Sequence, residues 1–235
     1  MSRVVLVTGG SRGLGLATAK AFADDGHRVA VTYRSAAPDD DRLTAVRCDV
    51  TDPVQVEDAF SAVEDDLGPV EVLVSNAAIT RDTLLLRMSE EDFTEVVDAN
   101  LTGGYRVAKR AVRSMMRARW GRIVFVSSVV GSTGQAGQAN YAASKAGLVG
   151  LARSLAREFA SRGITVNVVS PGPMATDMMD TVPEDRRELI AETVPLGRFG
   201  TPEEVAATIR FLASDQAAYT TGAVVPVDGG LGMGP

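Results

Sequence analysis

The chain has 235 residues, of which 45% are hydrophobic and 23% charged, and it carries a formal net charge of −6. The length suits one α/β domain with a large core, the acidic charge argues against nucleic-acid binding, and the single cysteine, Cys48, excludes an internal disulfide or a multi-cysteine metal site. No apolar run is long enough to span a bilayer and no signal-peptide pattern is present, so we expect a cytoplasmic protein that does not bind a membrane. With one cysteine and one histidine, we expect no metal site either.

Short apolar, β-branched runs alternate with helical patterns along the whole chain. Strands are predicted at 4–7, 29–31, 43–48, 70–74, 123–126, 164–169 and 223–227. Helices are predicted at 13–25, 53–67, 89–117, 141–162 and 202–213. Strands that are apolar on both faces are typical of parallel sheets covered by helices on both sides. The pattern therefore predicts an α/β fold: one doubly wound (Rossmann) domain over residues 1–235 with a seven-stranded parallel sheet.

Three segments between these elements are interpreted without regular structure. Residues 35–42 are rich in helix breakers and are predicted to form a loop. His27, the only histidine, is interpreted as a surface turn residue. Residues 174–200 are predicted to be loop-like and to cover a substrate; Met174, Met178 and Met179 either line an acyl-chain groove there or fill a mobile helix.

The turn between the first predicted strand and the first helix is rich in glycine. Gly9, Gly13 and Gly15 stand in VTGGSRGLG, where glycine lets the backbone approach a pyrophosphate held at the helix N-terminus. A plain strand-to-helix turn would also explain a lone glycine pattern. Its place after the first buried strand of an alternating chain favours a dinucleotide site.

Two arginines indicate which dinucleotide this site takes. Proteins that bind NAD usually carry an acid after the second strand, where it holds the ribose 2′-hydroxyl. Here Arg34 stands near that place and Arg12 lies in the glycine-rich turn, and two guanidinium groups suit a 2′-phosphate better than a hydroxyl. The later acids 39–41 are interpreted as a solvated turn. The expected cofactor is NADPH/NADP+.

A second pattern, in ANYAASKAGLVG, places Tyr141 and Lys145 four residues apart on a predicted helix, so that the two side chains share one face. A surface pair of small energetic value is the alternative. The chain has only three lysines, however, and a lysine here has a chemical use. Reduction of a ketone builds negative charge on oxygen and requires a proton donor, and a neighbouring ammonium would lower the pKa of the Tyr141 phenol from its usual value of about 10.

Together these two patterns resemble those of the short-chain dehydrogenases/reductases. The stretches CDVTD, VSNAA, DANLTGG and SPGPMATDM follow in that family's order, with Ser75 and Ala78 as departures in the VSNAA turn. The resemblance implies a reductase with four catalytic residues: Asn100, Ser128, Tyr141 and Lys145. It implies cofactor contacts from the following residues: Gly9, Ser11, Arg12, Gly13, Leu14, Gly15, Arg34, Asp49, Val50, Asn76, Ala77, Tyr141, Lys145, Pro171, Gly172, Met174 and Thr176.

The resemblance also gives these residues roles. Ser128 would hydrogen-bond the substrate carbonyl, with Ser127 as the neighbouring alternative. Asn100 would bend its helix and hold a water in a proton relay through Lys145; a packing kink is the alternative, since glycines 103 and 104 disturb the helical pattern beside it.

Within the family, the chain is most similar to the reductases that act on 3-oxoacyl-(acyl-carrier-protein) in fatty acid biosynthesis. That similarity implies a homotetramer and an acyl carrier protein as partner. It also implies that Arg119 and Arg162 receive the carrier beside the active-site mouth, although a solvated face is the alternative for most cations of the basic stretch 106–122. Two other functions stay open: a reductase of acetoacetyl-CoA, a polyketide or another small ketone, and a non-catalytic NADPH-sensing regulator.

Overall fold

The computed structural model describes residues 2–175 and 183–233. Its strands are β1 (Val4–Val7), β2 (Arg28–Tyr33), β3 (Leu43–Arg47), β4 (Val72–Ser75), β5 (Gly121–Val126), β6 (Ile164–Pro171) and β7 (Val224–Val227). The α-helices are α1 (Gly13–Asp24), α2 (Pro53–Leu67), α3 (Glu90–Val97), α4 (Gly103–Ala118), α5 (Val130–Thr133), α6 (Ala139–Phe159), α8 (Glu184–Thr193) and α9 (Pro202–Ala213). Short 3₁₀ turns lie at Leu85–Arg87, Ala160–Arg162 and Asp215–Ala217, and one π-helical turn, η2, spans Asp98–Thr102.

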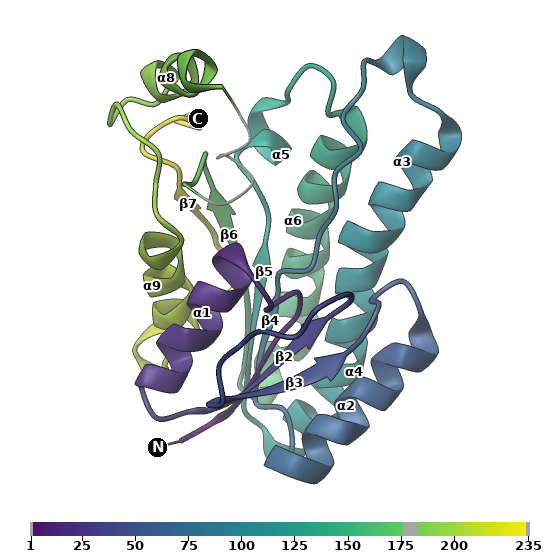
Figure 1. Ribbon diagram of the computed structural model, residues 1–235. Helices are drawn as coiled ribbons and strands as arrows, with labels where there is room; N and C mark the ends of the chain where they lie inside the picture. The colour runs from purple at the N-terminus through teal and green to yellow at the C-terminus, as the bar shows by residue number, and fades with distance from the viewer. Residues whose placement is uncertain (1, 176–182, 234–235) are drawn as a thin grey trace.

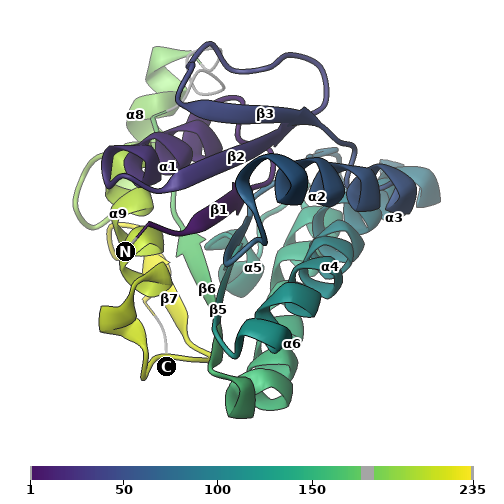
Figure 2. The ribbon, with the colours of Figure 1, turned by 90° about the horizontal axis from the view of Figure 1, so that it is seen from below.

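All seven strands pair in parallel in the order β3-β2-β1-β4-β5-β6-β7, which confirms the predicted doubly wound fold. Helices α1 and α9 pack together on one face, and α2, α4 and α6 cover the other (Figure 1 and Figure 2). Each face has its own apolar cluster, with Phe22 and Ile209 in the first and Phe60 and Phe125 in the second. Burying each such side chain contributes about 1.5–3 kcal/mol to folding.

Two segments differ from their prediction. The expected single helix over 89–117 is two α-helices, α3 and α4, joined by the π-helical turn η2. The expected loop-like segment 174–200 contains the helix α8. Helix α8 has no buried residue, so it lacks the apolar face from which a helix is recognised in a sequence. The predicted loop at 35–42 is confirmed, because the chain there enters no helix before β3 begins.

The strand order reverses beside β1: the chain builds outward through β2 to β3 and then returns to place β4 on the other side of β1. In open parallel sheets, ligands bind at the carboxyl ends of the strands next to such a reversal. The glycine-rich turn follows β1 and the VSNAA turn follows β4, so both predicted cofactor segments meet at this point.

Among residues 2–175 and 183–233, no helix is long and apolar enough to cross a membrane, and no group of three acidic, histidine or cysteine side chains forms a metal site.

Candidate active site

The glycine turn (residues 8–13) is held tightly against the end of β4. The Asn76 side chain donates from Nδ2 to the carbonyl oxygens of Thr8 and Gly9, both at 3.0 Å. In return, the Thr8 hydroxyl accepts hydrogen bonds from the backbone N–H groups of Asn76 and Ala77. A Cβ added at Gly15 would lie 2.3 Å from the Gly9 carbonyl oxygen, so only glycine allows α1 to start this close to the turn. This close-packed cradle, open at the N-terminus of α1, fits the phosphates of a dinucleotide.

The two predicted 2′-phosphate ligands lie beside that cradle. Arg12 is the N-cap residue of α1, and Arg34 directly follows β2; both are exposed. The two segments touch, since the Gly10 N–H donates to the Thr32 carbonyl oxygen at 2.9 Å. Neither arginine forms an ion pair with a described residue, which leaves both guanidinium groups available to an anion.

Other predicted cofactor residues are placed around the same edge. Asp49 and Val50 follow β3, but the Val50 side chain packs on α4, where a Cβ at Gly103 would lie 2.8 Å from Val50 Cγ2. Leu14 is a core side chain, so a contact from it would have to come from its backbone. Ser11 lies in the glycine turn and is half-buried.

The carboxyl end of β6 carries the predicted residues Pro171 and Gly172. The Val129 N–H donates to the Pro171 carbonyl oxygen at 2.8 Å, and Met174 forms a bridge with Gly200. A cavity of about 470 Å³ adjoins this segment. Its lining includes Pro173, Leu196, Gly200, Val227 and Met233. Thr176, Met178 and Met179 lie outside the described residues.

The positions of Ser127 and Ser128 at the end of β5 show which of the two serines lies near Tyr141. Ser127 turns toward α6, where its hydroxyl donates to the Lys145 carbonyl oxygen at 2.8 Å. The Ser128 hydroxyl accepts from the Val130 N–H at 3.2 Å, and hydrogen bonding with Ser128 acts to lower the pKa of the Tyr141 phenol. Ser128 and Tyr141 therefore form a hydroxyl pair at the predicted place, while Ser127 fastens the helix that carries the tyrosine.

The pKa of Tyr141 is shifted in the direction opposite to the expectation from sequence. Burial raises it, and the hydrogen bond with Ser128 offsets this only in part. Lys145 is buried, and burial lowers its pKa to about 8. Its Nζ donates to the Val126 carbonyl oxygen at 2.8 Å and lies 5.5 Å from the centre of the Tyr141 ring. The expected lowering of the phenol pKa fails here because desolvation disfavours both charged forms.

Asn100 lies in the π-helical turn, as the predicted bend requires. Its Oδ1 accepts from the Ile79 N–H at 2.8 Å, and its Nδ2 donates to the Ile79 carbonyl at 3.0 Å and to Ser144 Oγ at 3.1 Å. The Ser144 hydroxyl in turn donates to the Tyr141 carbonyl oxygen. Protein groups therefore occupy both ends of the Asn100 amide, and the expected water relay through Lys145 stays a prediction.

Asn140 is a site residue that sequence reasoning missed. It is fully buried and joins three segments. Its Nδ2 donates to the carbonyl oxygens of Arg81 and Asp92, at 3.0 and 3.1 Å, and its Oδ1 accepts from the Tyr141 N–H at 2.8 Å. Its place directly before Tyr141 was the available signal, but partners so distant in the chain leave no local pattern.

Comparison with known proteins agrees with this geometry. Residues 9–232 match the family described as enoyl-(acyl carrier protein) reductase. The 3-oxoacyl-(acyl-carrier-protein) reductase MabA of Mycobacterium tuberculosis is 56% identical over 235 residues, which cover 100% of this chain and 94% of that protein. The chain belongs to the short-chain dehydrogenase/reductase family. The 3-oxoacyl-(acyl-carrier-protein) reductase FabG of Escherichia coli K12 is 46% identical over 238 residues, covering 98% of each chain.

The two arginines expected at the active-site mouth lie elsewhere in this family member. Arg119 precedes β5 and Arg162 precedes β6, so both stand at the amino ends of strands whose carboxyl ends lead to the site. At about 3.3 Å per residue, β5 separates Arg119 from Ser128 by roughly 20 Å. The turns touch each other, because Arg119 Nη2 donates to the Ser161 carbonyl oxygen at 3.3 Å. The prediction that Arg119 and Arg162 lie beside the active-site mouth is therefore wrong for the active site of their own chain.

Much of the neighbouring basic stretch is neutralised. Arg106 pairs with Asp98 at 2.9 Å, and Arg110 pairs with Glu57 and Glu64 at 2.8 and 2.6 Å. Arg119 differs, since none of the described acids pairs with it. It also has a positive φ of 54°, a left-handed conformation that costs a non-glycine residue about 1 kcal/mol.

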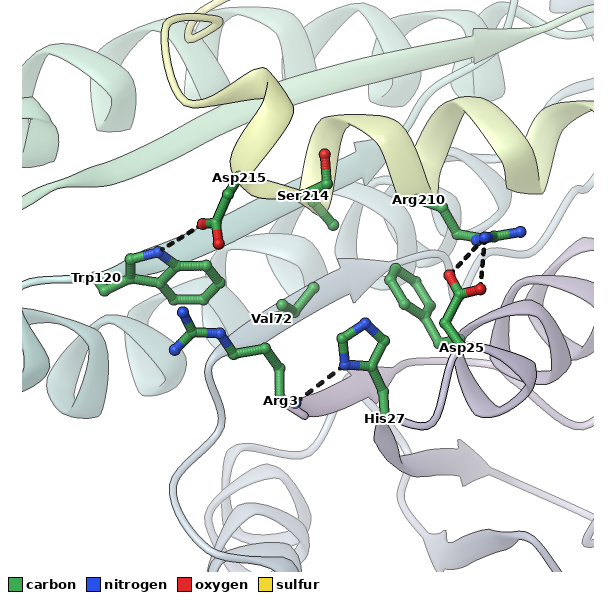
Figure 3. A pocket seen from close by; sticks show the side chains of 10 residues that line it. Arg3, Asp25, His27, Val72, Trp120, Arg210, Ser214 and Asp215 are labelled. Carbon is green, nitrogen blue, oxygen red and sulfur yellow. Dashed lines mark hydrogen bonds and ion pairs between the residues drawn. The ribbon is translucent and has the colours of Figure 1, made fainter. Parts of the chain in front are cut away.

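His27 lies in the predicted turn, but it is half-buried rather than a surface residue. It lines a cavity of about 130 Å³ at the amino ends of the strands, shown in Figure 3. Its Nδ1 accepts from the Arg3 N–H at 3.0 Å, and its ring meets Phe22 edge-on. Burial lowers the His27 pKa, although Asp25 acts in the opposite direction. The histidine therefore fastens the start of β1, far from the site residues.

Proposed function

We propose that this chain is an NADPH-dependent reductase of 3-oxoacyl-(acyl-carrier-protein), forming the 3-hydroxyacyl product in fatty acid biosynthesis. The observation that carries the proposal is the constellation of Ser128, Tyr141 and the buried Lys145 beside a glycine turn at the sheet's reversal point. Two relatives named as 3-oxoacyl-(acyl-carrier-protein) reductases, which match along nearly the whole chain, support the same substrate class.

In this proposal the cofactor supplies the hydride when bound. The glycine turn and the N-terminus of α1 hold its pyrophosphate, while Arg12 and Arg34 hold the 2′-phosphate. These residues fit the group, because glycine at position 15 lets the N-terminus of α1 lie against the turn and the two arginines have no acid partner in the described chain.

Ser128 and Tyr141 act on the substrate carbonyl. Ser128 donates a hydrogen bond to its oxygen and fixes its orientation, and Tyr141 transfers its phenolic proton to that oxygen as negative charge develops. The raised Tyr141 pKa keeps the phenol protonated and ready to donate at neutral pH. The Lys145 ammonium, buried in a low-dielectric site, stabilises the phenolate that remains. Asn100 holds α6 and the turn at Ile79 in register for this transfer.

Alternative functions use the same scaffold. The family description names an enoyl reduction, in which a carbon–carbon bond is reduced, but a serine–tyrosine hydroxyl pair suits a carbonyl oxygen better. A reductase of acetoacetyl-CoA, a polyketide or a small ketone has the same chemistry and differs only in its partner. A non-catalytic NADPH sensor would have no need for the complete set of Asn100, Ser128, Tyr141 and Lys145.

The deciding experiment measures NADPH oxidation with four matched substrates: acetoacetyl-carrier, acetoacetyl-CoA, a small ketone and crotonyl-carrier. We expect the highest kcat/KM with acetoacetyl-carrier. Preference for crotonyl-carrier would establish enoyl reduction instead, and equal kcat/KM for carrier and CoA substrates would remove the carrier from the proposal. Failure to oxidise NADPH with any of the four would leave the sensor.

We also propose that the chain forms one cytoplasmic reductase domain over residues 1–235, in which 174–200 covers the substrate, and that it assembles as a homotetramer. In such an assembly Arg119 and Arg162 receive the acidic carrier for the active site of another copy, since their own site is at the far end of the sheet. Arg119→Glu with Arg162→Glu should raise KM for acetoacetyl-carrier and spare acetoacetyl-CoA. Parallel loss with both substrates, or no loss, would contradict the docking role.

A further inference from the structure

Arg47, the last residue of β3, hydrogen-bonds the backbone of Arg34, one of the two arginines already assigned to the 2′-phosphate. We propose that Arg47 is the third cation of that site and a determinant of the preference for NADPH over NADH. The inference rests on the proposed function, because it concerns the same cofactor. The sequence gives no direct signal for it, since Arg47 belongs to a different strand from the residues that normally read the ribose.

The backbone brings the three arginines to the carboxyl ends of neighbouring strands. Strand β3 is the outermost strand, beside β2, and Tyr33 pairs with Arg47 across the two strands (Figure 2). The Arg47 Nε donates to the Arg34 carbonyl oxygen at 3.3 Å, so the Arg47 side chain lies across the turn that carries Arg34. The glycine turn joins the same strand end, through the 2.9 Å hydrogen bond from the Gly10 N–H to the Thr32 carbonyl oxygen.

The charges of this cluster are not balanced within the described part of the chain. Arg12, Arg34 and Arg47 are exposed and form no ion pair with any described acid. By contrast, Arg42, in the connection between β2 and β3, forms ion pairs with Asp40, at 2.7 Å, and with Asp24.

The remaining acids near the cluster do not neutralise it. Asp49 is turned toward Thr51, whose N–H and hydroxyl donate to its Oδ1 at 3.0 and 2.8 Å. Asp39 and Asp41 are exposed and unpaired within the described chain. Three like charges gathered on a protein of net charge −6 repel one another, and a doubly charged phosphate would remove that repulsion.

The guanidinium of Arg47 is suited to this task. Its Nε is used on the Arg34 carbonyl, which fixes the direction of the side chain, and no described residue accepts from its two Nη groups, so both can donate to phosphate oxygens. The hydroxyl of NADH offers neither the charge nor the additional acceptors. Arg47 should therefore contribute to the binding of NADPH and not to that of NADH.

The test is calorimetric titration of the whole protein with NADPH and with NADH, using two substitutions that separate charge from backbone support. Arg47→Gln can still donate to the Arg34 carbonyl but has no charge, and Arg47→Lys keeps the charge without the planar fork. We expect Arg47→Gln to weaken NADPH binding about tenfold, with NADH binding changed less than about twofold. Arg47→Lys should retain most of the NADPH affinity.

Arg153→Gln is the matched control, because Arg153 is an exposed arginine on α6 with no ion-pair partner in the described chain. It should leave both affinities unchanged, and unfolding curves should show that every variant folds like the parent. Equal weakening of both cofactors by Arg47→Gln, or no weakening of either, would overturn the inference. Because no ketone is present, these outcomes do not depend on the substrate; failure of the unsubstituted protein to bind NADPH would instead overturn the proposed function.

Discussion

Replacing Asn140 by leucine should loosen the start of α6 without opening a cavity, because leucine has the same branched skeleton and is not smaller than asparagine. The substitution removes three hydrogen bonds, to Arg81, Asp92 and Tyr141. The Asp92 carbonyl lies within helix α3 and keeps a helical partner, but the Arg81 carbonyl and the Tyr141 N–H are left unpaired. At about 1–3 kcal/mol for each of these two groups left without a partner, the free energy of unfolding should fall by about 2–6 kcal/mol. At about 2–4 °C per kcal/mol for a chain of this size, the melting temperature should fall by about 4–24 °C.

The assay combines urea and thermal unfolding with kcat measured well below the melting temperature. Asn167→Leu is the control, since Asn167 is also fully buried and joins β6 to the segment before β7 through bonds to Thr220 and Ala223. Both variants should lose similar stability, but only Asn140→Leu should also lower kcat, because only Asn140 holds the backbone of Tyr141. A melting temperature within about 2 °C of the parent, or equal effects of the two variants on kcat, would refute the reasoning.

Three further outcomes are expected. Tyr141→Phe should reduce turnover by orders of magnitude while NADPH still binds in a direct titration; near-normal turnover in the folded variant would remove Tyr141 as the proton donor. Because burial lowers the Lys145 pKa to about 8, kcat should fall as the pH rises through that value and the ammonium loses its charge, and a flat profile from pH 7 to 9 would contradict this. The His27 pKa is lowered in the fold, so its contribution to stability is complete above the unfolded value of about 6.5 and is lost as the pH falls below it. His27→Gln should therefore reduce the loss of melting temperature between pH 7 and 5, and equal losses in both proteins would argue against this role.

The doubly wound parallel sheet and the candidate site were predicted from local patterns. Gly9, Gly15 and the pair Tyr141 and Lys145 are recognisable because the cradle and the shared helix face each depend on residues close together in sequence. The parallel sheet follows from strands that are apolar on both faces. The parallel sheet was confirmed, and Tyr141 and Lys145 lie on one helix as expected, because the fold leaves these local preferences unchanged. The chemical roles of the site residues stay predictions.

Other features depend on contacts that no local pattern records. Asn140 gains its role from Arg81 and Asp92, which lie 59 and 48 residues away. The direction of the Tyr141 pKa shift depends on how deeply the phenol is buried, which spacing alone does not give. Helix α8 buries none of its residues, so its sequence carries end signals but no apolar stripe.

The position of Arg119 and Arg162 in the fold could have been predicted from their place in the chain. The family resemblance led instead to the expectation that they lie beside the active-site mouth. In a parallel sheet, a residue before a strand and a residue after it lie at opposite ends, so an arginine that precedes β5 cannot adjoin a serine that follows it. A carrier bound by these arginines would present its acyl group at the end of the sheet opposite to the active site of the chain that binds it. The docking role therefore requires that another copy present its active site at this end, and carrier-dependent turnover would then depend on assembly in a way that turnover of a small thioester does not. The strained backbone of Arg119, which fastens the two turns together, is consistent with a surface built for such a partner.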